Sequence, residues 1–546
     1  MIEIYRFENV QQQVAKISTA AVQKELGSRL SNSSAIFGPD DSRYNESTAR
    51  WDNFAVPQVQ LVIEPGTESD VPKIVKYCNQ HNIDFLAINR GHGSAQSLGS
   101  FNGIQINMVN LHNITIQPDG KSAWFQGGTY DGQVSRYLWE EGYVATTGSC
   151  DCVGLMGAGL GGGHGRHEGL YGMVSDNLLQ LNLVLGDGTT IRVNNNSHSD
   201  LLWGMKGAGH NFGIVTSFEM KIHPRGPDTW HYHNYIWTGD KLVNVFNTLN
   251  AFHRNGSTPV NMTTNFGNFF MNSSISTTEP IIWWTFSYRG SEEEAENLLA
   301  PFNAIGSVYE ESGNIPYPEV AHAQQTGEED AICQDGVIRI TSTSGLQVYN
   351  VTAEQQIWNS FVQRLKTNNE LAQGGIILHE GYSTAAVEAI NGDTSAYPFR
   401  LEDAAWEWAY EVRDLWNGGQ PNRLPDAYLN YANGFEPLEQ RFGHEPWRLE
   451  RLCNLKAKYD PKNRFRYFNP IVQEPSNYTN SINPGNYTTP SVNINHQWDM
   501  QHFCVPNVLF FRSIILEMNG PFLIVLPKPN YPFPHISEGF ISFPCI

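Results

Sequence analysis

The sequence predicts an α+β fold, and three observations carry that prediction. Between about residues 56 and 223, short β-rich runs are broken by glycine and spaced too unevenly for a regular βαβ array. From about residue 224 to 425, strand patterns alternate with amphipathic helix patterns. Hydrophobic residues make up 40% of the 546 and aromatic residues 12%, enough to bury a large core and exclude disorder for most of the chain.

In the first region, one helix is expected between the first two strands. Residues 69–81 (SDVPKIVKYCNQH) open with a Ser/Asp cap, carry Pro in the first turn and are amphipathic. Strands are expected at Val59–Ile63, Phe85–Ile88, Ile104–Met108, Leu179–Leu185 and Ile214–Ile222.

The second region has the pattern of another α+β domain. Its expected strands include Pro280–Tyr288 and Val337–Ser342. Its expected helices include Gly290–Phe302, Ala353–Asn368 and Glu402–Trp416. A last amphipathic helix follows within residues 445–471 and stops at Asp460-Pro461.

Charge and hydropathy exclude two classes of partner. Lys plus Arg is 35 and Asp plus Glu is 55, so the formal net charge is −20, whereas nucleic-acid binding needs a basic footprint. The apolar stretch at residues 508–527 is interrupted by Arg512, Glu517 and Pro521, so no run reaches the roughly 20 residues of a membrane span. We expect neither nucleic acid nor membrane as a partner.

The compartment stays open. The N-terminal residues lack an apolar h-region, so no signal peptide is visible, and secretion remains compatible only with an incomplete N-terminus. Seven cysteines are too few and too scattered for a disulfide scaffold, and their odd number leaves at least one outside an internal pair.

Three motifs could carry chemistry. Residues 157–165 (GAGLGGGHG) satisfy G-x-G-x-x-G, but the flanking residues are a poor match for the strand and helix of a dinucleotide-binding unit. Cys150, Cys152, His164 and His167 could ligate zinc, but C-x-C is tighter than the usual spacing. His92 lies between two glycines, a turn that lets backbone approach a bulky ligand and exposes its N–H groups.

Read in order, these stretches resemble the flavin-binding domain of the berberine-bridge-enzyme-like oxidases, in the vanillyl-alcohol-oxidase superfamily. The resemblance covers essentially residues 34–470. It is carried by RGHG, GSCDCVG, GLMGAGLGGGHG, LYGMVSDNLLQLNLVLGDG, LLWGMKGAGHNFGIVTSFEMKI, YLNYANG and FGHEPWRLERLCNLKAKYDPKNRFR. It implies a two-domain PCMH-type FAD-binding fold with an inserted α+β substrate domain.

The implied boundaries divide the chain into four parts. Residues 1–223 form the FAD-binding domain, with its core at about 54–225, and residues 224–425 form the substrate domain. Residues 426–472 return to the FAD domain, and residues 473–546 are a tail of unknown status.

The resemblance implies FAD, attached covalently at two points. His92 matches the histidine that bonds the flavin 8α-methyl carbon, and Cys150 matches the cysteine that bonds C6, although Cys152 leaves open which thiol is used. The FAD diphosphate is expected on the backbone N–H groups of Arg90–Ser94 and of the Gly154–Gly162 loop. The implied cofactor-binding residues are Arg90, Gly91, His92, Gly93, Ser94, Gly148, Cys150, Gly154, Gly157, Gly161, Gly162, Asp176, Asn177, Gly213, Ile214, Val215, Tyr428 and Asn430.

Tyr431, the second tyrosine of YLNY, matches the catalytic base of the alcohol-oxidising members. With an ordinary pKa of about 10, it needs a cationic or hydrogen-bonding neighbour to ionise near neutrality. Arg400 and His379 are the candidates, Glu380 is an alternative base, and a stacking role for Tyr431 stays open.

The expected activity is hydride transfer from a C–H bond bearing oxygen to FAD, with reoxidation by O2 to H2O2. The substrate is a small molecule, and we favour a secondary metabolite over the terminal hydroxyl of an oligosaccharide. No metal is expected. A flavin-free carbohydrate-binding protein with the same fold is the alternative from another class.

Overall fold

The computed structural model describes residues 16–253, 258–339, 341, 343–346, 348–369, 373–398, 407–434 and 436–472. The described residues up to Ile471 belong to one compact unit. The predicted tail from residue 473 lies outside the described residues. Across the described part of the chain, none of the helices combines the length and the apolar character needed to span a membrane.

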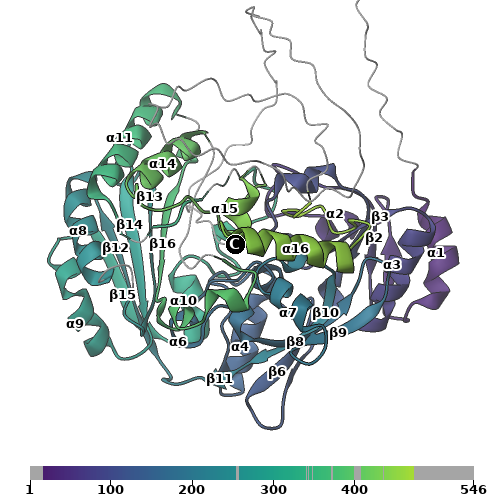
Figure 1. Ribbon diagram of the computed structural model, residues 1–546. Helices are drawn as coiled ribbons and strands as arrows, with labels where there is room; N and C mark the ends of the chain where they lie inside the picture. Colours follow the sequence, from purple (N-terminus) through teal and green to yellow (C-terminus); the bar gives the residue numbers. More distant parts are fainter. Residues whose placement is uncertain are drawn as a thin grey trace, which may run out of the picture. The chain divides into compact units, whose positions relative to one another are not determined.

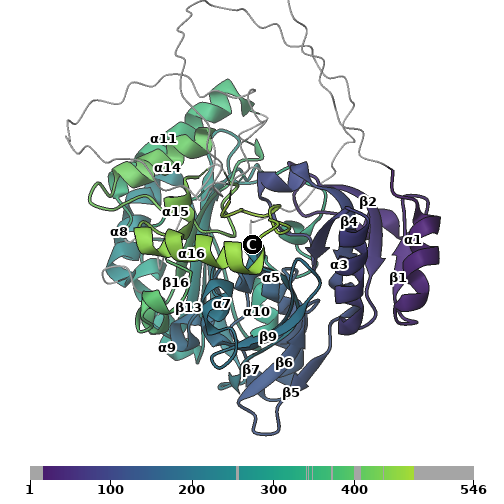
Figure 2. The same ribbon diagram turned by 45° about the vertical axis from the view of Figure 1, so that its right-hand side comes forward.

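A mixed four-stranded sheet forms the first layer. Its order is β1-β2-β4-β3; β1 runs antiparallel to β2, while β4 is parallel to both β2 and β3. The expected helix is present as α3, and a Thr67/Asp70 capping box closes the 3₁₀ turn that leads into it. Figure 2 shows α3 beside this sheet, with α1 at its outer end. The bounds are α1 Thr19–Leu26, β1 Ala35–Phe37, β2 Gln58–Glu64, α3 Val71–Gln80, β3 Asp84–Ile88 and β4 Asn102–Asn107.

An antiparallel five-stranded sheet forms the second layer, in the order β5-β6-β10-β8-β9. Its buried side chains share one core with α4, α7 and α16. Neither sheet is a doubly wound parallel sheet, so the dinucleotide-binding alternative for the G-x-G-x-x-G stretch is wrong. The bounds are β5 Ile114–Ile116, β6 Ser122–Gln126, α4 Asp131–Glu140, β8 Leu178–Val184, β9 Thr190–Asn194, α7 Ser199–Met205, β10 Ile214–Lys221 and α16 Pro446–Tyr459.

A second antiparallel five-stranded sheet, ordered β15-β12-β14-β13-β16, carries the chain between Trp230 and Tyr382. Alternate residues of each strand point to opposite faces. One face packs against α8, α9 and α11 in an apolar core. Figure 1 shows these helices along that face. We call this the helix face and the opposite one the open face. The bounds are β12 Trp230–Trp237, α8 Leu242–His253, β13 Met262–Phe270, β14 Ile281–Tyr288, α9 Glu292–Asn303, β15 Tyr309–Ile315, α11 Val351–Thr367 and β16 Ile377–Tyr382.

Short elements join the layers. The expected strand at Val337–Ser342 is wrong over its described residues, because Val337 forms only an isolated bridge with Asp52. The expected helix at Glu402–Trp416 is found as α14 from Glu407. The division into three folded parts stays a prediction. The remaining bounds are α2 Tyr44–Ser47, β7 Tyr143–Val144, α5 Leu155–Gly159, α6 Glu168–Tyr171, β11 His223–Pro224, α10 Tyr317–Ala323, α13 Ala385–Glu388, α14 Glu407–Gly418 and α15 Leu438–Phe442.

Candidate active site

The His92 turn follows β3 and presents a buried, unpaired imidazole. Gly91 has φ +75°, a conformation that favours glycine, and its carbonyl accepts a hydrogen bond from the Trp51 amide. The His92 ring stacks on Trp51 with 5.4 Å between centroids. Burial, reinforced by nearby arginines, lowers the pKa of His92 to about 3, so the ring is neutral. Among the described residues, His92 Nδ1 and Ser94 Oγ have no hydrogen-bond partner, which fits a bound group.

Arg90, the first residue of this turn, is held by protein groups. Its guanidinium pairs with Glu328 at 3.1 Å, donates to the Cys152 carbonyl and lies over the Tyr130 ring. Its side chain therefore joins three segments. The cofactor role predicted for Arg90 rests on its backbone.

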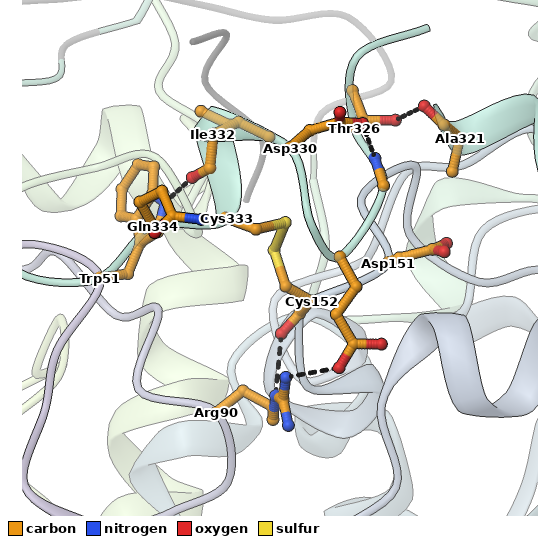
Figure 3. The surroundings of a disulfide bond; sticks show 12 residues. Trp51, Arg90, Asp151, Cys152, Ala321, Thr326, Asp330, Ile332, Cys333 and Gln334 are labelled. Carbon is orange, nitrogen blue, oxygen red and sulfur yellow. Dashed lines mark hydrogen bonds and ion pairs between the residues drawn. A yellow bond between two sulfur atoms is a disulfide. The ribbon is translucent and has the colours of Figure 1, made fainter. Parts of the chain in front are cut away.

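The segment Gly148–Gly154 is fixed by a disulfide, shown in Figure 3. Cys152 is bonded to Cys333, 181 residues further along the chain, and the neighbouring Ile332 carbonyl accepts from the Trp51 indole. A scaffold of disulfides was not expected, yet this bridge ties the segment to the residues beside His92. Cys78 is the free cysteine among the described residues.

Cys150 is buried. Attachment to flavin C6 requires a thiolate. The predicted role of Cys150 stays a prediction. Gly148 is required for space in any case, because a Cβ there would lie 2.4 Å from Asp131 Oδ2, and one at Gly154 would lie 2.7 Å from Asn89.

The glycine-rich segment is held by hydrogen bonds to Tyr428 and Asn430 of the YLNY motif. The Tyr428 hydroxyl accepts hydrogen bonds from the Gly163 and His164 amides, and Asn430 donates to the Ala158 carbonyl. A Cβ at Gly161 would lie 2.0 Å from Asn430 Oδ1. The close packing thus explains Gly161, whereas Gly157 has open space around its Cα.

Gly162 has φ +116° and faces the Tyr397 ring, so it too is needed by the protein. Tyr428 and Asn430 therefore position the glycine-rich segment through direct contacts. Their predicted contact with the cofactor stays a prediction.

Asp176, Asn177 and residues 213–215, which the resemblance also assigns to the cofactor, are held by protein contacts. The Asn177 amide donates to three carbonyls of residues 171–173, and Asp176 accepts from the Met173 amide. Gly213 leads into β10, where Ile214 and Val215 pair with β8 and are buried. A Cβ at Gly213 would lie 2.7 Å from Leu183. These contacts account for the residue types without a ligand.

Tyr431 contacts Glu380 on the open face of the sheet, where Tyr382 is also bonded to Glu380. The Tyr431 hydroxyl donates to Glu380 Oε2 at 2.6 Å, and Tyr382 reaches Ser149 at 3.0 Å. Burial raises the pKa of Glu380, although the bond from Tyr431 opposes that rise. Burial and the charge of Glu380 raise the pKa of Tyr431 well above its ordinary value.

Among the described residues, the hydrogen-bonding neighbour of Tyr431 is therefore a carboxylate, and only one of the two candidate activators, His379, can be placed. His379 points to the helix face, where its Nε2 contacts Glu354 at 2.9 Å. Arg400 lies outside the described residues. Glu380, expected only as an alternative base, contacts Tyr431 directly, and its role stays a prediction.

His164 completes this group of side chains. Its ring stacks on Tyr382, its Nδ1 contacts Glu168 at 2.8 Å and its Nε2 contacts the Tyr397 hydroxyl at 3.1 Å. His167 lies among Tyr171, Trp230 and Tyr317 instead. The zinc alternative is thus not supported, because Cys152 is in a disulfide and the two histidines have separate surroundings.

Asn268 is a site residue that sequence reasoning missed. It lies on the open face of β13, opposite Leu378 and Trp283, and is fully buried. Neither its amide oxygen nor its amide nitrogen has a hydrogen-bond partner within the described ranges. Asn268 is a diagonal neighbour of Glu380 across β13 and β16, a separation of roughly 7–8 Å. Unpaired polar groups of this kind are costly unless a ligand satisfies them.

Two family models match the chain. Residues 59–194 match a FAD binding domain, and residues 427–472 match the berberine and berberine-like family. The FAD-linked oxidoreductase anuG of Penicillium roqueforti is 51% identical over 84% of this chain and 93% of its own length. The FAD-linked oxidoreductase OXR2 of Pyricularia oryzae is 49% identical over 84% and 92%.

Solved structures support the fold. A chitooligosaccharide oxidase superposes with a TM-score of 0.67 at 20% identity, covering 83% of this chain and all of its own. Glucooligosaccharide oxidase from Acremonium strictum, described with a 6-S-cysteinyl, 8α-N1-histidyl FAD, superposes with a TM-score of 0.66 at 17% identity, covering 83% of this chain and 98% of its own.

Proposed function

Because the chain belongs to the FAD-linked oxidoreductases with a berberine-like C-terminal segment, we propose that it is an oxidase of alcohol-bearing small molecules. The observation that carries this proposal is the half-buried Glu380–Tyr431 pair on the open face of the sheet. The Tyr431 ring packs on Tyr428, which holds the glycine-rich segment. Bound FAD supplies the hydride acceptor, and O2 is the proposed final oxidant.

His92 is the proposed point of flavin attachment through the 8α carbon. A neutral, desolvated imidazole with an unpaired ring nitrogen is the nucleophile that such a bond requires. The Trp51 stack and the Gly91 turn hold its plane. A second attachment, at Cys150, is the finer form of the proposal.

The proposed base is the Glu380–Tyr431 pair. As the carbinol C–H bond breaks, the substrate hydroxyl gives its proton to the Tyr431 oxygen, and Tyr431 gives its own proton to Glu380. Tyr431 stays neutral at the start and end, which agrees with its raised pKa. The Glu380 carboxyl then holds the proton, which its own raised pKa favours.

The surroundings of Asn268 favour a metabolite over an oligosaccharide. Its cross-strand neighbours Leu378 and Trp283 are apolar, and Phe266 lies beside them on the same face. One unpaired amide among apolar side chains suits a substrate with a single oxygen function next to a carbon skeleton. A saccharide carries a hydroxyl on nearly every carbon and needs more partners. The oligosaccharide oxidases among the solved structures keep that class as the second candidate.

Acid precipitation of the purified protein tests the attachment. Flavin retained in the pellet, with a tryptic peptide carrying it at His92, is the expected result. Flavin found on the Cys150 peptide as well would establish attachment at both residues. Flavin released to the supernatant from wild-type protein would contradict covalent attachment.

A substrate panel tests the activity. We expect H2O2 release with hydrophobic primary and secondary alcohols and slower release with cello- or chito-oligosaccharides. Faster turnover of the oligosaccharides would reverse the substrate assignment. Flavin reduction by substrate without H2O2 release would identify a dehydrogenase.

A further inference from the structure

A second polar cluster lies on the helix face of the same sheet. His231 and His233 are two residues apart on β12, so both point toward α9, which supplies Glu296. The side chains of His231 and His233 are only 1% and 9% exposed, and that of Glu296 is 29% exposed. Their three ligand atoms all lie within 4.8 Å of one another.

Both ring nitrogens of His231 face oxygen atoms that accept hydrogen bonds. Its Nδ1 lies 3.0 Å from Asn314 Oδ1, and its Nε2 lies 2.9 Å from Glu296 Oε1. The Asn314 amide cannot be reversed freely, because its Nδ2 donates to Glu292 at 2.7 Å. A neutral imidazole carries one proton, yet both nitrogens of His231 face acceptors.

His233 faces the same carboxylate oxygen. Its Nδ1 lies 2.7 Å from Glu296 Oε1, while its Nε2 lies 3.9 Å from Glu310 Oε2. The second oxygen of Glu296 accepts from Asn303 at 2.8 Å. Two imidazole nitrogens and one carboxylate oxygen thus converge, and each of the three side chains has an outer partner.

We propose that His231 Nε2, His233 Nδ1 and Glu296 Oε1 bind a divalent transition-metal ion such as Zn²⁺. Two imidazoles and a carboxylate are a common zinc ligand set, with water in the fourth position. Tetrahedral ligands at about 2.0–2.1 Å from zinc lie roughly 3.3 Å apart, so the two present contacts to Glu296 open by about 0.5 Å.

The outer partners match those of a metal site. With Nε2 on the metal, His231 donates Nδ1–H to Asn314, and with Nδ1 on the metal, His233 turns Nε2–H toward Glu310. Asn303 orients the carboxylate of Glu296. A hydrogen bond such as that of His231 to Asn314 fixes the ring tautomer of a metal-ligating histidine, while the contact of His233 with Glu310 is a longer ion-pair contact.

The proposed ion has a structural role. It joins α9 to β12, while Asn314 and Glu310 bring in the edge strand β15, on the face away from Glu380 and Asn268. The proposal is therefore independent of the flavin chemistry.

Zinc titration of the untagged, chelator-treated flavoprotein tests this site. We expect one equivalent of Zn²⁺ by isothermal calorimetry and elemental analysis, and a higher Tm with zinc. His233→Gln and Glu296→Gln should each weaken the Kd at least 100-fold, and Asn314→Ala about 10- to 100-fold. His322→Gln, which removes an exposed histidine outside the cluster, should leave the Kd unchanged.

Flavin absorbance reports whether each variant is folded, and Cu²⁺ electron paramagnetic resonance on the wild-type protein gives a readout that needs no variant. A spectrum with two imidazole nitrogens at one site supports the proposal. Failure of wild-type protein to bind a stoichiometric ion, or zinc binding unchanged in both His233→Gln and Glu296→Gln, overturns it. The cluster would then be an imidazolium–carboxylate ion pair.

Discussion

His379 and Glu380 are consecutive residues of β16 that belong to different chemical environments. His379 points to the helix face, where Glu354 accepts from its Nε2 and from the Trp416 indole at 2.9 Å each. Glu380 points to the open face and meets Tyr431. Glu354 is buried and Glu380 is half-buried, and both accept hydrogen bonds, but only Glu380 lies beside residues that the family resemblance assigns to the site.

The two carboxylates differ in how far the side chains around them are satisfied by hydrogen bonds. Glu354 is enclosed by aromatic side chains of the apolar core and holds α11 to β16 and α14. Glu380 lies near Asn268, whose amide is unpaired in the described part of the protein. Both oxygens of Glu354 have partners, which indicates a structural role, whereas the unpaired amide of Asn268 indicates a place for a ligand.

The largest effect is expected on the open face. Glu380→Gln keeps the shape of the side chain but cannot accept the proton, so flavin reduction by substrate should slow about 10²- to 10⁴-fold. Anaerobic stopped-flow absorbance measures this rate. Glu354→Gln is the matched control on the other face and should leave the rate of correctly folded protein nearly unchanged. Equal loss of rate in both variants would contradict the assignment of Glu380.

A substitution on the helix face should instead lower the free energy of unfolding. Glu354→Ala leaves His379 and Trp416 without their shared acceptor, and breaking such a buried pair costs about 3–5 kcal/mol of unfolding free energy. Urea unfolding measures the change. Gln356→Ala, at an exposed position of the same helix, should cost far less. A stable Glu354→Ala protein would show that the pair contributes little.

The pH dependence distinguishes Glu380 from a tyrosinate base. Glu380 accepts a proton only when ionised, so the rate should rise with pH through its pKa. Burial raises that pKa, which places the limb above the ordinary value of about 4.3. The pH profile of flavin reduction should lose this limb in Glu380→Gln. A wild-type rate that rises only in the range of tyrosine ionisation would assign the base to Tyr431.

The smallest effect concerns two asparagines of β13. Asn268→Leu removes unpaired polar atoms from the open face, so stability should hold or rise while KM increases about tenfold. Asn265→Leu is the counterpart on the helix face, where the amide bonds to His253 and Thr258. That variant should lose about 1–3 kcal/mol of stability. Unchanged KM in Asn268→Leu would remove Asn268 from the substrate site.

Local patterns predicted most of the strands and helices. The strand Ile281–Tyr288 and the helix Glu292–Asn303 follow from β-branched and aromatic runs and from a Ser/Glu capping box. Val337–Ser342 misled the prediction, because a short apolar run forms a strand only where a partner strand is free to pair. The site motifs were found through family resemblance, which identified His92 and the YLNY segment.

The functional pairings could not be read from the sequence. Alternation places His379 and Glu380 on opposite faces, but only the register with β13 and the packing of α11 decide which face is apolar. Asn268 and Asn265 lie in one run, NFGN, and nothing local distinguishes a satisfied amide from an unpaired one. The Cys152–Cys333 bridge joins residues 181 positions apart, beyond any spacing rule.

Tyr428 and Asn430 hold the glycine-rich segment from a position more than 260 residues later in the chain. During translation, residues 157–165 leave the ribosome long before these two side chains exist. A nascent chain can therefore form its early sheets while the segment still lacks its fastening. The contacts of Tyr428 and Asn430 can therefore form only late in synthesis, and a chain that ends before residue 428 would lack them.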